Sequence, residues 1–304
     1  MPLVTPAVIS ALNTSFSLSY QGAYSKAPVF WDQIATEIPS NTTSGTYGWM
    51  QQVNSLRQWV GARVIRDLAG SAYNLVNLPF ELTFGVDKHD LDDQQTGIYN
   101  LRAQEFGNAA AKWPDEQVVA ALWAGRPAGA GLCFDGLTMF NANHMLSGVA
   151  QSNTNTLALS PAAYETVRAA MRGFVGESGR SLGVRPNVLW CCPQLESTAK
   201  RILEADFMAD AVVATASTIN VNKGTAKLLV IDELGALSTT TWGLADTTKP
   251  IKPMIWQLRQ APLFTQMTDP NAESVMMTRQ YTWGVEARGA AGYGPWWLAY
   301  LGNV

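Results

Sequence analysis

Few residues in this sequence combine the side chains of acid–base, nucleophilic or metal chemistry with a recognisable spacing. The two histidines, His89 and His144, stand in neither an HExxH motif nor a Cys/His zinc spacing. Ser197 and Lys200 match the SxxK pattern of acyl-transfer serines, but the companion motifs Ser-Asp-Asn and Lys-Thr-Gly do not occur. We therefore expect His89 at the surface among aspartates, His144 packed in a turn-rich loop, and Lys200 solvated on a helix face.

The sequence supports metal binding, nucleotide binding and thiol chemistry no better than it supports histidine or serine–lysine catalysis. The acidic stretch 87–93 lacks the glycine and the closing glutamate of an EF-hand loop. The glycines of segment 129–131 have no third glycine at dinucleotide-binding spacing, and there is no Walker A sequence. Cys133, Cys191 and Cys192 are too few for a disulfide framework, so we expect a reducing compartment and core packing for the adjacent pair. Because no group separates acid, base and nucleophile roles, the sequence predicts no catalytic site, cofactor or metal.

The composition is that of a folded, soluble chain with few charges. Of 304 residues, 15% are charged and 47% are hydrophobic, and the net charge is −3. This balance argues against a dedicated nucleic-acid binder and against disorder. The first cation is Lys26, and the apolar run 118–124 is far short of the roughly 20 residues of a membrane span. We expect a protein made in a cytoplasm, with no secretory signal.

Charges are distributed unevenly along the chain. Residues 1–56 hold only three formal charges, and residues 136–164 hold none. For 141–160 we favour a neutral surface loop. For 1–56 we favour burial by another subunit, because interface cores are poor in charge and rich in aromatic residues and methionine. The side chains of these types in that stretch are Phe30, Trp31, Tyr47, Trp49 and Met50.

The strongest local signal is a β-strand over 73–86, where apolar and other residues alternate strictly from Val76 to Val86. Pro79 cannot donate to a strand ladder, which predicts an edge strand or a two-stranded ribbon. We expect its partner at 59–68. A ribbon of this length is marginal alone in water, so it needs a surface to lie on.

The two limbs of this ribbon differ in sign. Arginines lie on the first limb and aspartates follow the second, which is compatible either with solvated charge clusters or with docking between neighbouring copies. The sequence does not decide between these alternatives. The candidate inter-subunit contact residues are Arg57, Trp59, Arg63, Arg66, Asp87, Asp90, Asp92 and Asp93.

Helices and an α/β segment follow. A stripe from Tyr99 to Trp113 at spacings of three and four predicts a helix that lies across a sheet, with Pro114 starting a second stretch and Gly125 ending it. Ser160 caps a helix that starts at Pro161. We expect a second helix from Pro193, and the expected strands are 188–192, 228–231, 254–258 and 275–285. The aromatic tail 292–300 should be buried, and 1–48 should be an extended arm with one short helix at most.

Several strings in this order resemble the major head (capsid) subunit of Mu-like phages, from about residue 27 to the end. They are IATEIPS at 34–40, LPFELTFGVDKHDLDD at 78–93 with GIY at 97–99, FDG at 134–136 through NH at 143–144, RPNVL at 185–189, and GVEARGAAGYG at 284–294.

The resemblance implies an α+β fold, the tailed-phage capsid fold of the Hong Kong 97 type. It implies an N-terminal arm (1–48), an extended loop (49–93), a peripheral domain with a long spine helix (94–159 and 261–304) and an axial domain (160–260). The order of the elements predicted from the residues agrees with this division.

The implied function is a major capsid protein that self-assembles into an icosahedral head around double-stranded DNA. Expected partners are other copies in hexamers and pentamers, scaffold and portal proteins, a decoration protein and non-specifically held DNA, with no membrane. The fold carries no catalytic site to transfer. The alternatives are another virion protein of the tail or decoration type, or a soluble α/β enzyme of an unrecognised family.

Overall fold

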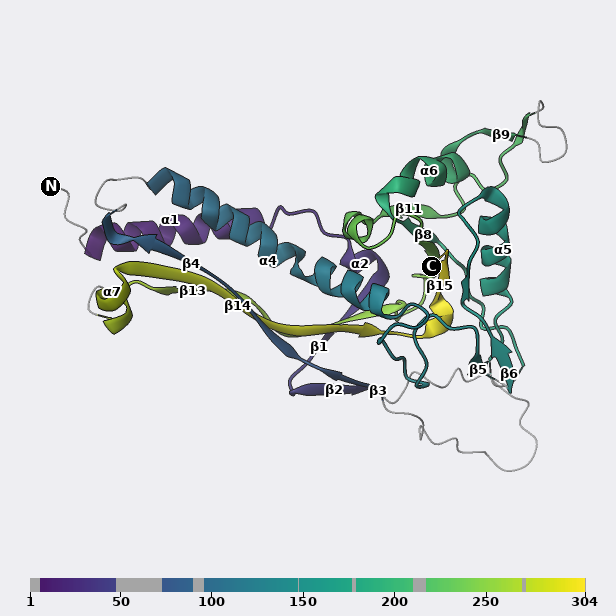
Figure 1. Cartoon of the computed structure of the whole chain (residues 1–304), viewed down its shortest axis with the longest axis horizontal. Helices are drawn as coiled ribbons and strands as arrows, with labels where there is room; N and C mark the ends of the chain where they lie inside the picture. The colour runs from purple at the N-terminus through teal and green to yellow at the C-terminus, as the bar shows by residue number, and fades with distance from the viewer. Residues whose placement is uncertain are drawn as a thin grey trace.

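The computed structural model describes residues 6–47, 73–89, 96–146, 148–176, 179–209, 217–269 and 272–303. Two parts follow one another along the long axis of the molecule (Figure 1). One is an elongated limb built on a four-stranded sheet, and the other is an α/β module built on a five-stranded sheet.

The limb sheet has the strand order β1-β13-β14-β4. Its strands are β1 (Ala35–Pro39), β13 (Met254–Met267), β14 (Gln280–Tyr293) and β4 (Leu78–Asp87). As Pro79 predicted, β4 is an edge strand. It pairs antiparallel with β14, from Leu78 opposite Gly289 to Asp87 opposite Gln280. The sequence did not predict this partner, and the proposed partner 59–68 lies outside the described residues.

One long helix, α4 (Thr96–Ala124), covers this sheet, as its apolar stripe predicted. Its aromatic residues meet those of β4: the ring centroids of Phe106 and Phe84 are 4.7 Å apart, and those of Trp113 and Phe80 are 5.1 Å apart. The helix ends before Gly125, where a Cβ atom would lie 2.7 Å from Met139 Cβ. Only glycine therefore lets the chain turn so close to the following loop.

The N-terminal segment differs from the expected extended arm. Residues Pro6–Tyr24 form a 19-residue helix, α1, which runs along α4 in the limb (Figure 1). Its buried residues, Ile9, Leu12, Phe16 and Tyr20, recur at spacings of three and four. The extended conformation expected for this segment was wrong, because serine, threonine and asparagine between these positions resemble a loop composition.

Of the aromatic residues in that stretch, Tyr47 is already buried by its own chain, so the expected covering by another subunit was wrong for it, whereas Phe30 and Trp31 are half-buried and their covering stays a prediction. Tyr47 is 6% exposed, and its hydroxyl donates to Gln257 Oε1 at 2.5 Å. Trp31 packs against Trp256 in the same chain. Trp49 and Met50 lie outside the described residues.

The module sheet has the order β11-β8-β12-β15-β7. Its strands are β7 (Thr154–Asn155), β8 (Val188–Cys191), β11 (Lys227–Val230), β12 (Trp242–Ala245) and β15 (Ala299–Gly302). The predicted helices are present as α5 (Pro161–Arg172) and α6 (Glu196–Glu204). Ser160 Oγ caps α5 by accepting from the Ala163 N–H, as expected.

Sheet membership corrects two sequence assignments. The strand at 254–258, grouped by sequence with the segment 160–260, belongs to β13 of the limb sheet. The tail is buried as expected, but its strand β15 pairs with β12 in the module. The expected late strand begins later than predicted, because α7 (Glu273–Thr278) precedes β14.

Short elements complete the described chain. They are α2 (Trp31–Ile34), β2 (Ser44–Tyr47), β3 (Tyr73–Val76), β5 (His144–Leu146), β6 (Val149–Gln151), η1 (Pro193–Leu195), β9 (Phe207–Ala209), β10 (Ser217–Ile219), η2 (Asp232–Ala236) and η3 (Trp296–Leu298). A shared hydrophobic core joins the limb and the module. It includes Trp113 and Trp256 of the limb and Trp190 and Trp242 of the module.

Candidate functional site

The SxxK pattern is part of an exposed helix face. Lys200 and Glu196 lie one turn apart on α6, with Nζ and Oε1 2.6 Å apart. The hydrogen bond that Lys200 Nζ donates to this carboxylate raises the pKa of Lys200. Lys200 is therefore an exposed lysine on a helix face, as expected, with its ammonium paired to a carboxylate of the same helix.

His144 is fully buried and fixed on both sides of its ring. Nδ1 lies 2.6 Å from Asp135 Oδ2, and Nε2 lies 3.2 Å from the Met139 carbonyl oxygen. The ring stacks on Trp296 with centroids 4.3 Å apart. The histidine is therefore packed in the interior of the module, as expected: its exposed fraction is 0%, and each ring nitrogen lies within hydrogen-bond distance of an oxygen atom.

The three thiols are free and buried. Burial raises the pKa of Cys191 to about 12 and also raises the pKa of Cys133 and Cys192. Thiolates, which are the nucleophiles and metal ligands, are therefore disfavoured at all three positions. Within the described ranges, no three His, Cys, Asp or Glu residues are grouped as a metal site.

Of the predicted contact residues, the structure describes Asp87 only. It closes β4 opposite Gln280, and its Oδ1 accepts from the His89 N–H at 2.8 Å. The exposed His89 agrees with expectation. The other predicted contacts, Arg57, Trp59, Arg63, Arg66, Asp90, Asp92 and Asp93, lie outside the described residues.

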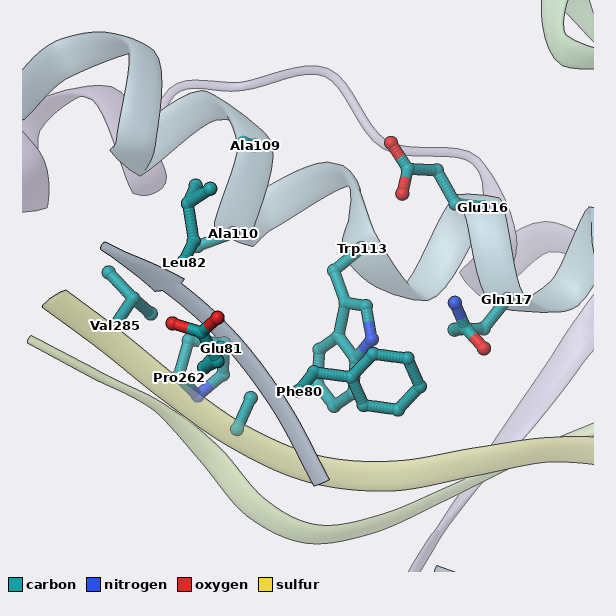
Figure 2. A pocket seen from close by; sticks show the side chains of 11 residues that line it. Phe80, Glu81, Leu82, Ala109, Ala110, Trp113, Glu116, Gln117, Pro262 and Val285 are labelled. Carbon is teal, nitrogen blue, oxygen red and sulfur yellow. The ribbon is translucent and has the colours of Figure 1, made fainter. Parts of the chain in front are cut away.

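A groove of about 250 Å³ runs between α4 and the edge strand β4 (Figure 2). It arises because α4 presents the small residues Ala109 and Ala110 opposite Leu82. Beside it, the indole N–H of Trp113 is buried without a hydrogen-bond partner in the described part of the chain. Glu81 and Glu116 also line the groove. Among the residues that the structure describes, β4 has a strand partner on one side only, and such an edge beside an apolar groove is a surface suited to covering by another polypeptide.

Sequence reasoning missed a second kind of surface. The module carries two small hairpins with exposed apolar side chains, among them Met145, Phe207 and Ile219. The signal that could have indicated one of them is the charge-free segment 136–164. In place of the expected neutral loop at 141–160, the chain there forms β5, β6 and β7.

These features describe surfaces for association rather than a reaction centre. The family model of the Mu-like prophage major head subunit gpT matches residues 9–160, 151–234 and 232–303. The chain belongs to this family. It is a phage capsid protein, and the resemblance suggested by its sequence strings is confirmed.

Curated relatives agree over nearly the whole chain. The Mu-like prophage FluMu major head subunit of Haemophilus influenzae is 26% identical over 99% of this chain and 74% of its own length. The major capsid protein of Escherichia phage Mu is 28% identical over 98% of this chain and 74% of its own length.

A solved structure gives the same result. The procapsid subunit of bacteriophage JBD30 is 34% identical, with a TM-score of 0.59, and the match covers 98% of this chain and 75% of that one. The fold is therefore the mixed α and β capsid fold of the Hong Kong 97 type. No helix in the described ranges combines the length and apolar character of a membrane span.

Proposed function

We propose that this chain builds a closed icosahedral head of hexamers and pentamers that encloses double-stranded DNA. The observation that carries this proposal is the family match, which extends over nearly all of the chain. A net charge of −3 suits containment, because enclosing DNA does not require tight phosphate binding.

In this head, residues 94–159 and 261–304 act as the peripheral domain and residues 160–260 as the axial domain, except that the strand at 254–258 belongs to the limb sheet and the tail strand β15 to the module sheet. Residues 1–48 and 49–93 act as the arm and extended loop that contact neighbours. The outer edge of β4, which no strand of the described ranges pairs with, and its groove support this proposal, since neighbouring copies would cover them.

The proposed partners are other copies, scaffold and portal proteins, a decoration protein and DNA held non-specifically, and assembly takes place in the host cytoplasm. We propose no catalytic role, which the ion pair of Lys200 and the burial of the thiols support. A tail or decoration role is less well supported, because the matched family consists of head subunits.

Electron microscopy tests the proposal. The full chain, co-expressed with a scaffold and purified, should form closed shells of pentamers and hexamers. Small discrete oligomers under every condition would exclude the shell function and favour a soluble enzyme. Tubes or protein bound only to preformed shells would instead indicate a tail or decoration protein.

A further inference from the structure

Two β-hairpins protrude from the module at opposite ends of α5 (Figure 1). One is formed by β9 and β10, and the other by β5 and β6. Each is a two-stranded sheet of three-residue strands, and such sheets are marginal in water unless something packs against them.

The β9–β10 hairpin presents apolar side chains to solvent. Phe207 and Ile219 are cross-strand partners and are 64% and 72% exposed, and Val221 is 75% exposed. Asn220, between Ile219 and Val221 in the sequence, is buried. Its side-chain amide donates to the carbonyl oxygens of Ile202 at 2.9 Å and Ala205 at 2.8 Å. This anchor holds Asn220 inward, so its two apolar neighbours are held outward.

The β5–β6 hairpin has the same construction. His144 and Leu146 are buried, whereas Met145 between them is 59% exposed and Val149 is 58% exposed. The contacts of His144 with Asp135 and Trp296 fix the inward side. Outward exposure of apolar side chains is therefore set by the fold at both hairpins, and it is not a consequence of frayed ends.

The two hairpins also share a low content of charged residues. Segment 136–164 holds no Asp, Glu, Lys or Arg, and segment 207–222 holds only Asp210. Apolar, charge-poor surface is typical of interface cores and unusual on the free surface of a monomer. Two such surfaces suit each other, because the described strands of both hairpins carry no Asp, Glu, Lys or Arg, and the charges of Asp206 and Lys223 beside the β9–β10 hairpin are paired with each other.

We infer that the β9–β10 hairpin of one copy packs against the β5–β6 hairpin of the next copy. The inference rests on the proposed shell function. The hairpins lie at opposite ends of α5 (Figure 1), so the two surfaces of one copy face different directions and each can meet a different neighbour. Such a head-to-tail contact uses two different surfaces and can close into a ring.

Cysteine pairing in assembled heads tests the contact. Ile219→Cys and Met145→Cys are introduced singly and together in the full chain, and heads are oxidised and separated under denaturing conditions. The double variant should give a ladder of disulfide-linked chains that ends at pentamers and hexamers. Each single variant should remain monomeric, because the two surfaces differ. The native cysteines are buried and do not interfere.

A matched control pairs Met145→Cys with Leu18→Cys, which is exposed on α1 in the limb and should give no ladder. Val221→Cys and Val149→Cys supply three further hairpin combinations. If shells form but none of the four combinations links chains, the inference is wrong and the shell function stands. Dimers from a single variant would show a symmetric contact and would also overturn it. Failure of the unmodified chain to form shells would reject the proposed function itself.

Discussion

Asp115 shows how one buried carboxylate fixes a chain segment in the limb. Its Oδ1 accepts hydrogen bonds from the Phe30 N–H at 3.0 Å and the Trp31 N–H at 2.7 Å. Burial is the largest cause that raises the pKa of Asp115, and the charges of Glu233 and Asp32 add to it. The two backbone hydrogen bonds oppose this shift without cancelling it.

We predict that Asp115→Asn keeps or raises the free energy of unfolding at neutral pH, because an amide oxygen still accepts both N–H groups while the buried charge is removed. Asp115→Ala should lower it by about 1–3 kcal/mol, since both N–H groups lose their acceptor. Urea denaturation of the unassembled chain measures both. A loss for Asp115→Asn as large as that for Asp115→Ala would contradict this account.

The same residue gives a pH dependence with a definite sign. Because the pKa of Asp115 is higher in the folded state, that state binds more protons just above the ordinary carboxyl range. The part of its contribution to stability that comes from protonation is therefore full at low pH and is lost as pH rises through the folded pKa, whereas the two backbone hydrogen bonds remain. This part of the pH dependence should be absent from Asp115→Asn.

At the scale of elements, α1 depends on one fully buried ring. Phe16 is 0% exposed and lies between Trp283 and Phe84, with ring centroids 5.0 Å and 6.1 Å away. Phe16→Ala should lower the free energy of unfolding by about 3–5 kcal/mol, because it leaves a cavity between helix and sheet. Leu18→Ala on the exposed side of the same helix is the control. Equal effects in thermal denaturation would show that α1 is not packed as described.

Local signals predicted elements better than partners. The alternation from Val76 to Val86 and the position of Pro79 were enough to predict an edge strand, because both act within one segment. The partner β14 lies far along the chain, and no local pattern specifies it. The buried stripe of α1 was missed because its intervening polar residues suggest a loop.

For the candidate sites too, local sequence signals were informative about single residues but not about the residues they contact. Sequence indicated that Lys200 and His144 carry no reaction, because the accompanying motifs are missing. It could not show which carboxylate each one contacts, nor that Asn220 and His144 hold two hairpins with their apolar sides outward. Such placement depends on packing between distant segments.

At the scale of the whole molecule, assembly depends on two kinds of contact. The hairpins are nearly free of charge, whereas Arg63 and Arg66 belong to the basic first half of the proposed extended loop. Charges set register and association rate more than affinity.

We predict that the double substitution of Arg63 and Arg66 to Glu prevents shell formation while the single chain keeps its Tm and circular dichroism spectrum. The control variant, with both arginines replaced by Lys, keeps the charge and should form shells. Light scattering and electron microscopy distinguish these results. Normal shells from the Glu variant would show that these arginines do not dock between subunits.

The module sheet has a consequence for synthesis of the protein on the ribosome. Its strand β12 ends at Ala245, but the neighbouring strand β15 begins at Ala299, and the whole β13–β14 ribbon lies between them. The nascent module therefore lacks the strand that lies between β12 and the edge strand β7 until the ribbon has been translated. The module sheet cannot be completed before β15 has been synthesised. A chain that stops before Ala299 therefore leaves the position between β12 and β7 empty and does not form a native subunit.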